Sequence, residues 1–395
     1  MKRKTLFLLI VICACTSGLN AQLTSFESNG KYGFRDKNGK ETVPARYDAV
    51  AGFQAGFARV ALDSRIGYID ESGKEIVPPK YDDAGDFVPD VSITVVMLGD
   101  KIGFIDKTGK EVISPRYDDI KLFFREENYM CVVADNKHGV VDFSGKETVP
   151  PQYEVPLIFY EGLAEAKLNG KWGFIDKENK TVIPIKYDDA NRFSEGLAAV
   201  ESNGKWGFID KTDKVIIPFR YEDAERFSEG YVAVEEKEKW GYIDKTGKVA
   251  VSFRYDGGDP FKGGLAVVHT GDWPDPVYGV VDTKGRLIVP LKYSYISNDF
   301  AGPEGLAAVE SDDKWGFINR ENKVVIPLKY EDARSFSEGL LAVKRDGKWG
   351  FIDPADRTVI GFKYDNAGSF SKGRAEVKLG ERVFYIDKSG NEIRE

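Results

Sequence analysis

One pattern recurs along almost the whole chain and limits the folds open to it. Ten glycines follow one another at intervals of 34 to 38 residues, and a tyrosine stands fourteen residues after each of them. All of the variation in spacing falls after the tyrosine, so the glycine-to-tyrosine segment is a rigid module and the remainder behaves as a loop. The glycines are Gly33, Gly67, Gly103, Gly139, Gly173, Gly207, Gly241, Gly279, Gly316 and Gly350, and Phe384 takes the place of an eleventh.

Each repeat predicts three antiparallel strands. In residues 197–230 the strands are LAAVE, WGFID and KVIIP, and Asn203-Gly204 joins the first two as a two-residue hairpin turn. Six residues after each anchor position the chain has only Gly, Asn or Asp, which adopt a left-handed backbone most readily. Three residues after the anchor stands an aspartate, or Asn319 in one repeat, and we expect this side chain to accept backbone N–H groups in the turn.

A repeat of this length cannot bury a core alone, so neighbouring repeats must share one. The sequence therefore predicts an all-β protein, a tandem array of about eleven three-stranded antiparallel meanders. We favour an open, curved or superhelical array. The alternative is one or more β-propellers, but propeller blades usually have four strands and number about 4–8.

Residues 1–21 are typical of an export signal. Lys2, Arg3 and Lys4 form a basic end, residues 6–14 are apolar but too short to span a bilayer, and Ala21 offers a small residue for cleavage. We therefore expect a repeat array over residues 22–395 of a secreted or periplasmic protein, without an integral membrane span. The alternative is a lipoprotein anchored through Cys15, because the residues before it loosely resemble a lipobox.

Residues 171–176, with the sequence KWGFID, and the copies at Trp206, Trp240, Trp315 and Trp349 resemble the bacterial WG-repeat (KWG-type β-repeat) family. The resemblance covers residues 24–395 and implies β-rich repeats, often on exported proteins. It implies no established reaction or ligand. We expect these tryptophans to pack in the core. Divergent repeats carry another residue at the tryptophan position: Tyr32, Ile66, Ile102, His138 and Tyr278.

The sequence contains no recognisable catalytic motif. Its two histidines, His138 and His269, fall in different repeats, and no GxSxG, Walker or dinucleotide-binding pattern occurs in context. We therefore expect no enzyme activity, no cofactor and no metal. His138 is interpreted as a core substitute, and Cys131, the only cysteine after residue 21, as a small buried apolar residue. The formal net charge of −8 makes nucleic acid an unsuitable partner.

Acidic pairs follow the tyrosine in several repeats. They could form a row that binds calcium or a cationic ligand, but no calcium-loop spacing is present, and we favour solvated linkers. An alternative function, an envelope-associated carbohydrate-active enzyme, would use two such carboxylates. Catalytic pairs are normally unique, however, whereas these recur: Asp82-Asp83, Asp118-Asp119, Asp188-Asp189, Glu222-Asp223 and Glu331-Asp332.

The clearest departure from the repeat lies at residues 269–276, where the other repeats have a tight hairpin. His269, Asp272, Trp273 and Asp275 are the candidate ligand-binding residues, and Trp273 is the only tryptophan outside the anchor position. The next repeat has a longer linker at residues 297–304. Adjacent insertions on a repeat scaffold often mark a binding surface, although tolerated drift of loops is the competing interpretation. We expect an exported, non-enzymatic scaffold that binds a protein, peptide or glycan.

Overall fold

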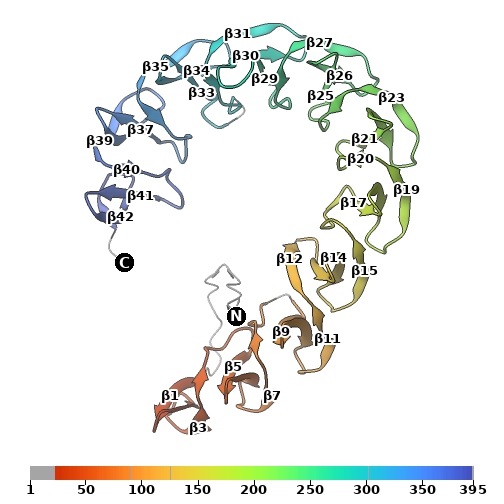
Figure 1. Cartoon of the computed structure of the whole chain (residues 1–395). Helices are drawn as coiled ribbons and strands as arrows, with labels where there is room; N and C mark the ends of the chain where they lie inside the picture. Colours follow the sequence, from red (N-terminus) through yellow and green to blue (C-terminus); the bar gives the residue numbers. More distant parts are fainter. Residues whose placement is uncertain (1–22, 90, 125, 301, 394–395) are drawn as a thin grey trace. The chain divides into compact units, whose positions relative to one another are not determined.

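The computed structural model describes residues 23–89, 91–124, 126–300 and 302–393, and every regular element within these ranges is a β-strand. The predicted export signal, with Cys15 and its alternative as a lipid anchor, lies outside the described residues. The chain divides into two compact units, residues 1–157 and 158–395. Within each unit, small antiparallel sheets follow one another in chain order (Figure 1).

The first unit contains four sheets. The first has three strands and the next three have four strands each. In chain order the strands are β1 (Thr24–Ser28), β2 (Lys31–Arg35), β3 (Glu41–Tyr47); β4 (Ala49–Val50), β5 (Phe57–Leu62), β6 (Arg65–Asp70), β7 (Glu75–Tyr81); β8 (Asp83–Ala84), β9 (Ile93–Leu98), β10 (Lys101–Asp106), β11 (Glu111–Tyr117); β12 (Asp119–Phe124), β13 (Tyr129–Ala134), β14 (Lys137–Asp142) and β15 (Glu147–Tyr153).

The second unit contains seven sheets of four strands. Their strands are β16 (Phe159–Tyr160), β17 (Leu163–Leu168), β18 (Lys171–Ile175), β19 (Thr181–Tyr187); β20 (Asp189–Ala190), β21 (Leu197–Ser202), β22 (Lys205–Asp210), β23 (Val215–Tyr221); β24 (Asp223–Ala224), β25 (Tyr231–Glu236), β26 (Lys239–Asp244), β27 (Val249–Tyr255); β28 (Gly257–Gly258), β29 (Leu265–Thr270), β30 (Val277–Asp282), β31 (Leu287–Tyr293); β32 (Tyr295–Ile296), β33 (Leu306–Ser311), β34 (Lys314–Asn319), β35 (Val324–Tyr330); β36 (Asp332–Ala333), β37 (Leu341–Arg345), β38 (Lys348–Ile352), β39 (Thr358–Tyr364); β40 (Asn366–Ala367), β41 (Arg374–Leu379), β42 (Arg382–Asp387) and β43 (Glu392–Ile393).

The predicted all-β tandem array with three main strands per repeat is confirmed, and the structure adds a fourth strand to ten of the eleven sheets. This strand comes from the linker after the repeat tyrosine. In β20, for example, Asp189 pairs with Glu201 and Ala190 with Val200. Nine of these ten strands have only two residues, too few to produce an alternating pattern, so they could not be predicted from the sequence.

The conserved spacing within each repeat reflects close backbone approach at the anchor and a left-handed turn after it. A Cβ atom on Gly207 would lie 2.9 Å from the carbonyl oxygen of Ile217, because a bulge brings the third strand against the second. At the turn, Asp213 has a φ of 67°. The Asp210 carboxylate accepts hydrogen bonds from the backbone N–H groups of Thr212 and Lys214. The predicted turn chemistry is therefore confirmed in this repeat.

The hydrophobic core lies between consecutive sheets. Leu197, Ala199, Phe208, Ile217 and Tyr221 project from one face of sheet β20–β23 into a cluster with residues of the following sheet. The opposite face of the same sheet packs backward on the preceding one. Sheet β20–β23 therefore buries both of its faces, and its stability must come from contacts with the neighbouring repeats.

Polar contacts also connect neighbouring repeats. The Tyr187 hydroxyl donates to Asp213 Oδ1 over 2.5 Å, one repeat further on. The Glu195 carboxylate accepts the backbone N–H of Gly230 and the ammonium of Lys245, both at 3.0 Å. Glu195 itself has a φ of 53°, a left-handed conformation that this clamp helps to hold.

The outermost described sheets carry charged residues on faces that internal sheets bury. In β2, Arg35 takes a position held by isoleucine or valine in the other repeats, and its guanidinium lies 3.8 Å from the ring centroid of Phe26. In β41, Arg374 and Glu376 replace leucine and alanine of an internal repeat. The Arg374 guanidinium lies 4.6 Å from the ring centroid of Tyr385. These charges give the end faces the polarity expected of capping repeats.

Candidate binding site

The candidate loop, residues 271–276, joins β29 to β30 in sheet β28–β31. Its base is anchored as in an ordinary repeat: Gly271 N donates to Asp256 Oδ2 over 2.8 Å, just as Asn203 N donates to Asp188 Oδ2. The additional residues extend beyond this anchor. Asp275 N donates to the carbonyl oxygen of Asp272 over 3.1 Å and closes a turn at the tip.

Trp273 stands at this tip and is 88% exposed. The tryptophans at the repeat position are different: Trp349 is buried, and Trp206 and Trp240 pack partly buried against the clusters between sheets. For these three the interpretation as core residues is confirmed.

The carboxylates of Asp272 and Asp275 lie in the same turn as Trp273 and are exposed. Neither accepts a hydrogen bond or forms an ion pair with any residue that the structure describes. The pKa of Lys239 is raised by its hydrogen bond to Asp256 and, to a smaller extent, by the negative charge of Asp272. The turn therefore presents one indole ring and two carboxylates to solvent.

His269, the fourth predicted site residue, is positioned differently. It lies within β29, opposite Gly257 and Tyr278, and its ring centroid is 5.4 Å from that of Tyr278. Its Nε2 atom would be 2.3 Å from a Cβ atom on Gly257, so the imidazole occupies space that a side chain at residue 257 would need. His269 therefore packs on its own sheet rather than joining the turn at the loop tip.

Two departures from the repeat beside the loop were missed in the sequence. The second long strand begins with Lys or Arg in ten sheets, but β30 begins with Val277, which is 37% exposed. In most repeats this lysine or arginine forms an ion pair with the acidic residue after the repeat tyrosine, as Lys239 does with Asp256. Here that acid is replaced by Ser294. An alignment of the chain's own repeats would have revealed both changes.

An apolar residue follows directly after Ser294. Tyr295, in β32, takes the position of an aspartate in several other repeats and is 40% exposed. Its ring centroid is 6.4 Å from that of Tyr278 and 5.3 Å from that of Trp315. Sheets β28–β31 and β32–β35 therefore bring aromatic rings together on an edge that is charged in other repeats.

The described part of the longer linker at residues 297–304 forms hydrogen bonds with neighbouring segments. Ser297 is buried and its hydroxyl accepts the backbone N–H of Ala308. The Asn298 amide donates to the carbonyl oxygen of Pro260 over 3.1 Å. These contacts give this part of the linker a packing role.

The recurring acidic pairs have structural partners. Asp188 accepts from the ammonium of Lys171 and from the N–H of Asn203, and Asp189 accepts its neighbour's N–H. Across the described ranges, no group of three or more His, Cys, Asp or Glu side chains is placed to hold a metal ion. Among the described residues, the first acid of each pair therefore anchors a hairpin by accepting a hydrogen bond from its backbone.

Glu201 shows the electrostatic cost of placing further acids along this edge. Burial raises the pKa of the Glu201 carboxyl, and the negative charges of Asp188, Asp189 and Asp223 raise this pKa further. The pKa of Glu235 is raised in the same way, by burial and then by Asp223. The edge therefore carries excess negative charge in repeats that precede the candidate loop.

Cys131 and His138 form the one sulfur–imidazole contact among the described residues, with Sγ 4.0 Å from Nδ1. Cys131 is fully buried, and burial raises the pKa of its thiol. Burial also lowers the pKa of His138. Both shifts favour the uncharged forms, which fits the interpretation of Cys131 as a buried core residue.

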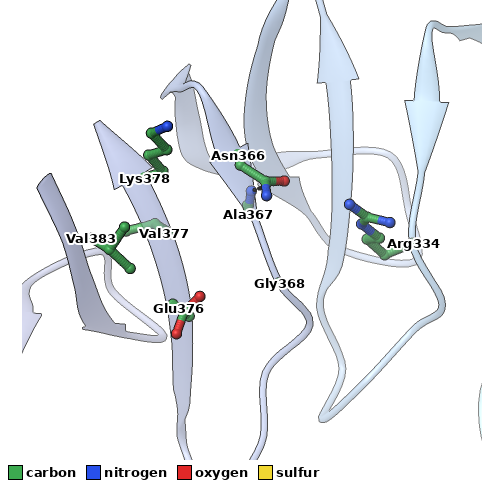
Figure 2. A pocket seen from close by; sticks show the side chains of 8 residues that line it. All are labelled: Arg334, Asn366, Ala367, Gly368, Glu376, Val377, Lys378 and Val383. Carbon is green, nitrogen blue, oxygen red and sulfur yellow. Dashed lines mark hydrogen bonds between the residues drawn. The ribbon is translucent and has the colours of Figure 1, made fainter. Parts of the chain in front are cut away.

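A hollow of about 180 Å³ lies between sheets β36–β39 and β40–β43. Figure 2 shows Arg334 on one side of it, Lys378 and Glu376 on the other, and Asn366 between them. The Arg334 guanidinium also lies 4.8 Å from the ring centroid of Trp349. Acidic and basic groups are mixed around this hollow, so its charge favours no one class of ligand.

The family model of the WG containing repeat matches ten segments of the chain: residues 32–65, 66–101, 102–137, 139–172, 172–206, 206–240, 240–272, 278–315, 315–349 and 349–382. A comparison with curated proteins found no match. Within the described ranges, no helix has the length and apolar character needed to cross a membrane.

Several solved structures are similar at low identity. PorZ, a surface component of the type-IX secretion system of Porphyromonas gingivalis, is 10% identical with a TM-score of 0.25, covering 92% of this chain and 67% of its own. The extracellular domain of the two-component protein BT3049 from B. thetaiotaomicron is 9% identical with a TM-score of 0.25, covering 87% of this chain and 64% of its own. Kluyveromyces lactis Hsv2p is 14% identical with a TM-score of 0.30, covering 66% of this chain and 88% of its own. Similarities at this level carry no argument about function.

Proposed function

The chain belongs to the family of proteins built from the WG containing repeat, and on that premise we propose that it is an exported, non-enzymatic scaffold. Its partner is a protein, peptide or glycan, and the binding site is the loop at residues 271–276. The sequence of residues 1–21 supports export, since a basic end, a short apolar stretch and Ala21 follow one another.

The exposure of Trp273 carries this proposal. Exposing a whole indole ring to water is unfavourable, and tryptophan is enriched among the residues that dominate binding energy at interfaces. The ring stands on an insertion whose base keeps the hydrogen bond of an ordinary hairpin. Packing within the repeat therefore does not explain the tryptophan at residue 273, whereas binding of a partner does.

A pulldown from envelope fractions tests the proposal. The protein from Gln22 onward is immobilised and compared with the variants Trp273→Ala and Val249→Ala. Val249 is an exposed apolar residue of another sheet and serves as the matched control. We expect Trp273→Ala to lose a partner that the unchanged protein and Val249→Ala retain, with an unchanged melting temperature. A large loss in melting temperature for Trp273→Ala, with binding intact, would contradict the proposal.

A further inference from the structure

Several departures from the repeat occur together around one loop, and together they determine the chemistry of that surface. Trp273 and Val277 belong to the loop and the strand after it, Tyr295 belongs to the next short strand, and its ring lies near that of Tyr278. In other repeats the positions of Val277 and Tyr295 usually carry charged side chains. The chain has therefore exchanged charge for partly exposed apolar surface at this place.

Two acidic groups of the loop lack an ion pair among the described residues. Residues 263–283 contain no lysine or arginine. The base that begins the second long strand elsewhere is absent because Val277 replaces it. The acid that this base pairs with in other repeats is Ser294 here, so the exchange leaves no unpaired charge at residue 277 itself. Asp272 and Asp275 flank the exposed indole with no described ion pair of their own. The acid that anchors this hairpin, Asp256, is paired with Lys239 just as Asp188 is paired with Lys171. The carboxylates that stay outside such a pair are those at the tip of the loop.

From this geometry we infer that the partner is a polypeptide segment rich in lysine or arginine. This inference rests on the proposed function and specifies its partner. A basic side chain over the Trp273 ring gains a cation–π interaction, and a neighbouring basic side chain meets Asp272 or Asp275. The apolar stems of lysine and arginine, or an adjacent aliphatic residue, cover Val277 and Tyr295.

Charge complementarity favours this partner over the other two classes in the proposed function. The chain has a formal net charge of −8, and Glu201 and Glu235 add acidic charge along the repeats before the loop. An acidic surface raises the association rate of a basic partner and opposes an acidic one. A neutral glycan would give no role to the two exposed carboxylates beside the indole.

Fluorine NMR of protein labelled with 5-fluorotryptophan provides a readout specific to the loop. The chain has six tryptophans, and the Trp273 resonance is identified by its absence from Trp273→Phe. Three probes are titrated: a short peptide of lysine, arginine and leucine, its twin with glutamate at each basic position, and chitohexaose. We expect only the basic peptide to shift the Trp273 resonance, with affinity that falls as sodium chloride is raised.

The contribution of the two carboxylates is tested with Asp272→Asn/Asp275→Asn. The control is Asp312→Asn/Asp313→Asn, which makes the same change of charge in the corresponding hairpin of the next sheet. Asn is suited there because both residues have positive φ, 52° and 56°. We expect the loop variant to bind the basic peptide about 5- to 10-fold more weakly, the effect of removing two exposed ion pairs, and the control to bind within about 2-fold of the unchanged protein.

Three results would overturn the inference: equal weakening by the two double variants, a shift of Trp273 by chitohexaose or the acidic peptide instead, or no shift with any probe. The pulldown separates this failure from failure of the proposed function. If Trp273→Ala loses an envelope partner that is neutral or acidic, the scaffold function stands and the basic partner is wrong. If Trp273→Ala loses nothing, both are wrong.

Discussion

The hydrogen bond from a repeat tyrosine to an acid of the next repeat can be measured against a neighbour that lacks it. Tyr187 donates to Asp213, whereas residue 247, the position corresponding to Asp213 one repeat later, is glycine and leaves the Tyr221 hydroxyl without a carboxylate acceptor. Both tyrosines are buried, and each is stacked at 6.3 Å on a phenylalanine of the next sheet. Substitution of each by phenylalanine therefore changes only the hydroxyl.

We expect Tyr187→Phe to lower the free energy of unfolding by about 1.5 kcal/mol. A hydrogen bond to a charged group contributes about 1.5–3 kcal/mol, and the lower value applies because the Asp213 side chain is 19% exposed and still pairs with Lys186. Tyr221→Phe removes a buried hydroxyl that has no carboxylate partner and should change stability by less than about 0.5 kcal/mol. Urea denaturation followed by circular dichroism measures both.

A rescue experiment extends the comparison. Gly247→Asp should give Tyr221 the acceptor that Tyr187 already has, since Asp213 adopts the same left-handed turn with a φ of 67°. In the Gly247→Asp background, Tyr221→Phe should then cost about 1.5 kcal/mol. Equal losses for Tyr187→Phe and Tyr221→Phe in the unchanged protein would refute the reasoning, because the two differ in the acceptor.

Three further predictions concern the edge, the turn and the ends of the array. The pKa of Glu201 is raised in the folded protein, so its ionised form destabilises the fold once the pH is above that pKa. Glu201→Gln should therefore raise the melting temperature at pH 7 and leave it unchanged below the ordinary pKa of glutamate. The same gain at both pH values would contradict this prediction. Gly247 has a φ of 81°, so Gly247→Val should cost about 1–2 kcal/mol and Gly247→Asn much less, as thermal melts would show. Arg35→Ile with Arg374→Leu removes charge from both end faces and should produce concentration-dependent association in size-exclusion chromatography with light scattering; a monomer at every concentration would exclude a capping role.

The sequence alone was sufficient to predict the features that recur within each repeat. The spacing of glycine and tyrosine, the left-handed turn and the turn aspartate each recur in about ten copies, so the repeats confirm one another. The close backbone approach at Gly207 comes from the third strand of the same sheet, which is why it recurs with the module.

Features that join different modules were not predictable in the same way. The hydrogen bond from Tyr187 to Asp213 spans 26 residues and depends on how two sheets pack. His269 was grouped with Asp272, Trp273 and Asp275 because they are close in sequence, yet strand pairing places it opposite Gly257. Val277 and Ser294 were both visible in the sequence, but the structure was needed to show that these two positions usually carry the base and the acid of an ion pair.

Deletion of residues 197–230 tests most directly the claim that stability sums over neighbouring sheets in an open array. The deletion joins β20 to β25 and lets the face of sheet β16–β19 that packed on Ala198, Val200 and Ile209 pack instead on the corresponding residues of the next repeat. Calorimetry and circular dichroism should show a folded, shorter array that still melts cooperatively, because every remaining interface has the same form. Complete loss of cooperative β-structure would contradict the open array and favour a closed ring whose geometry requires every repeat.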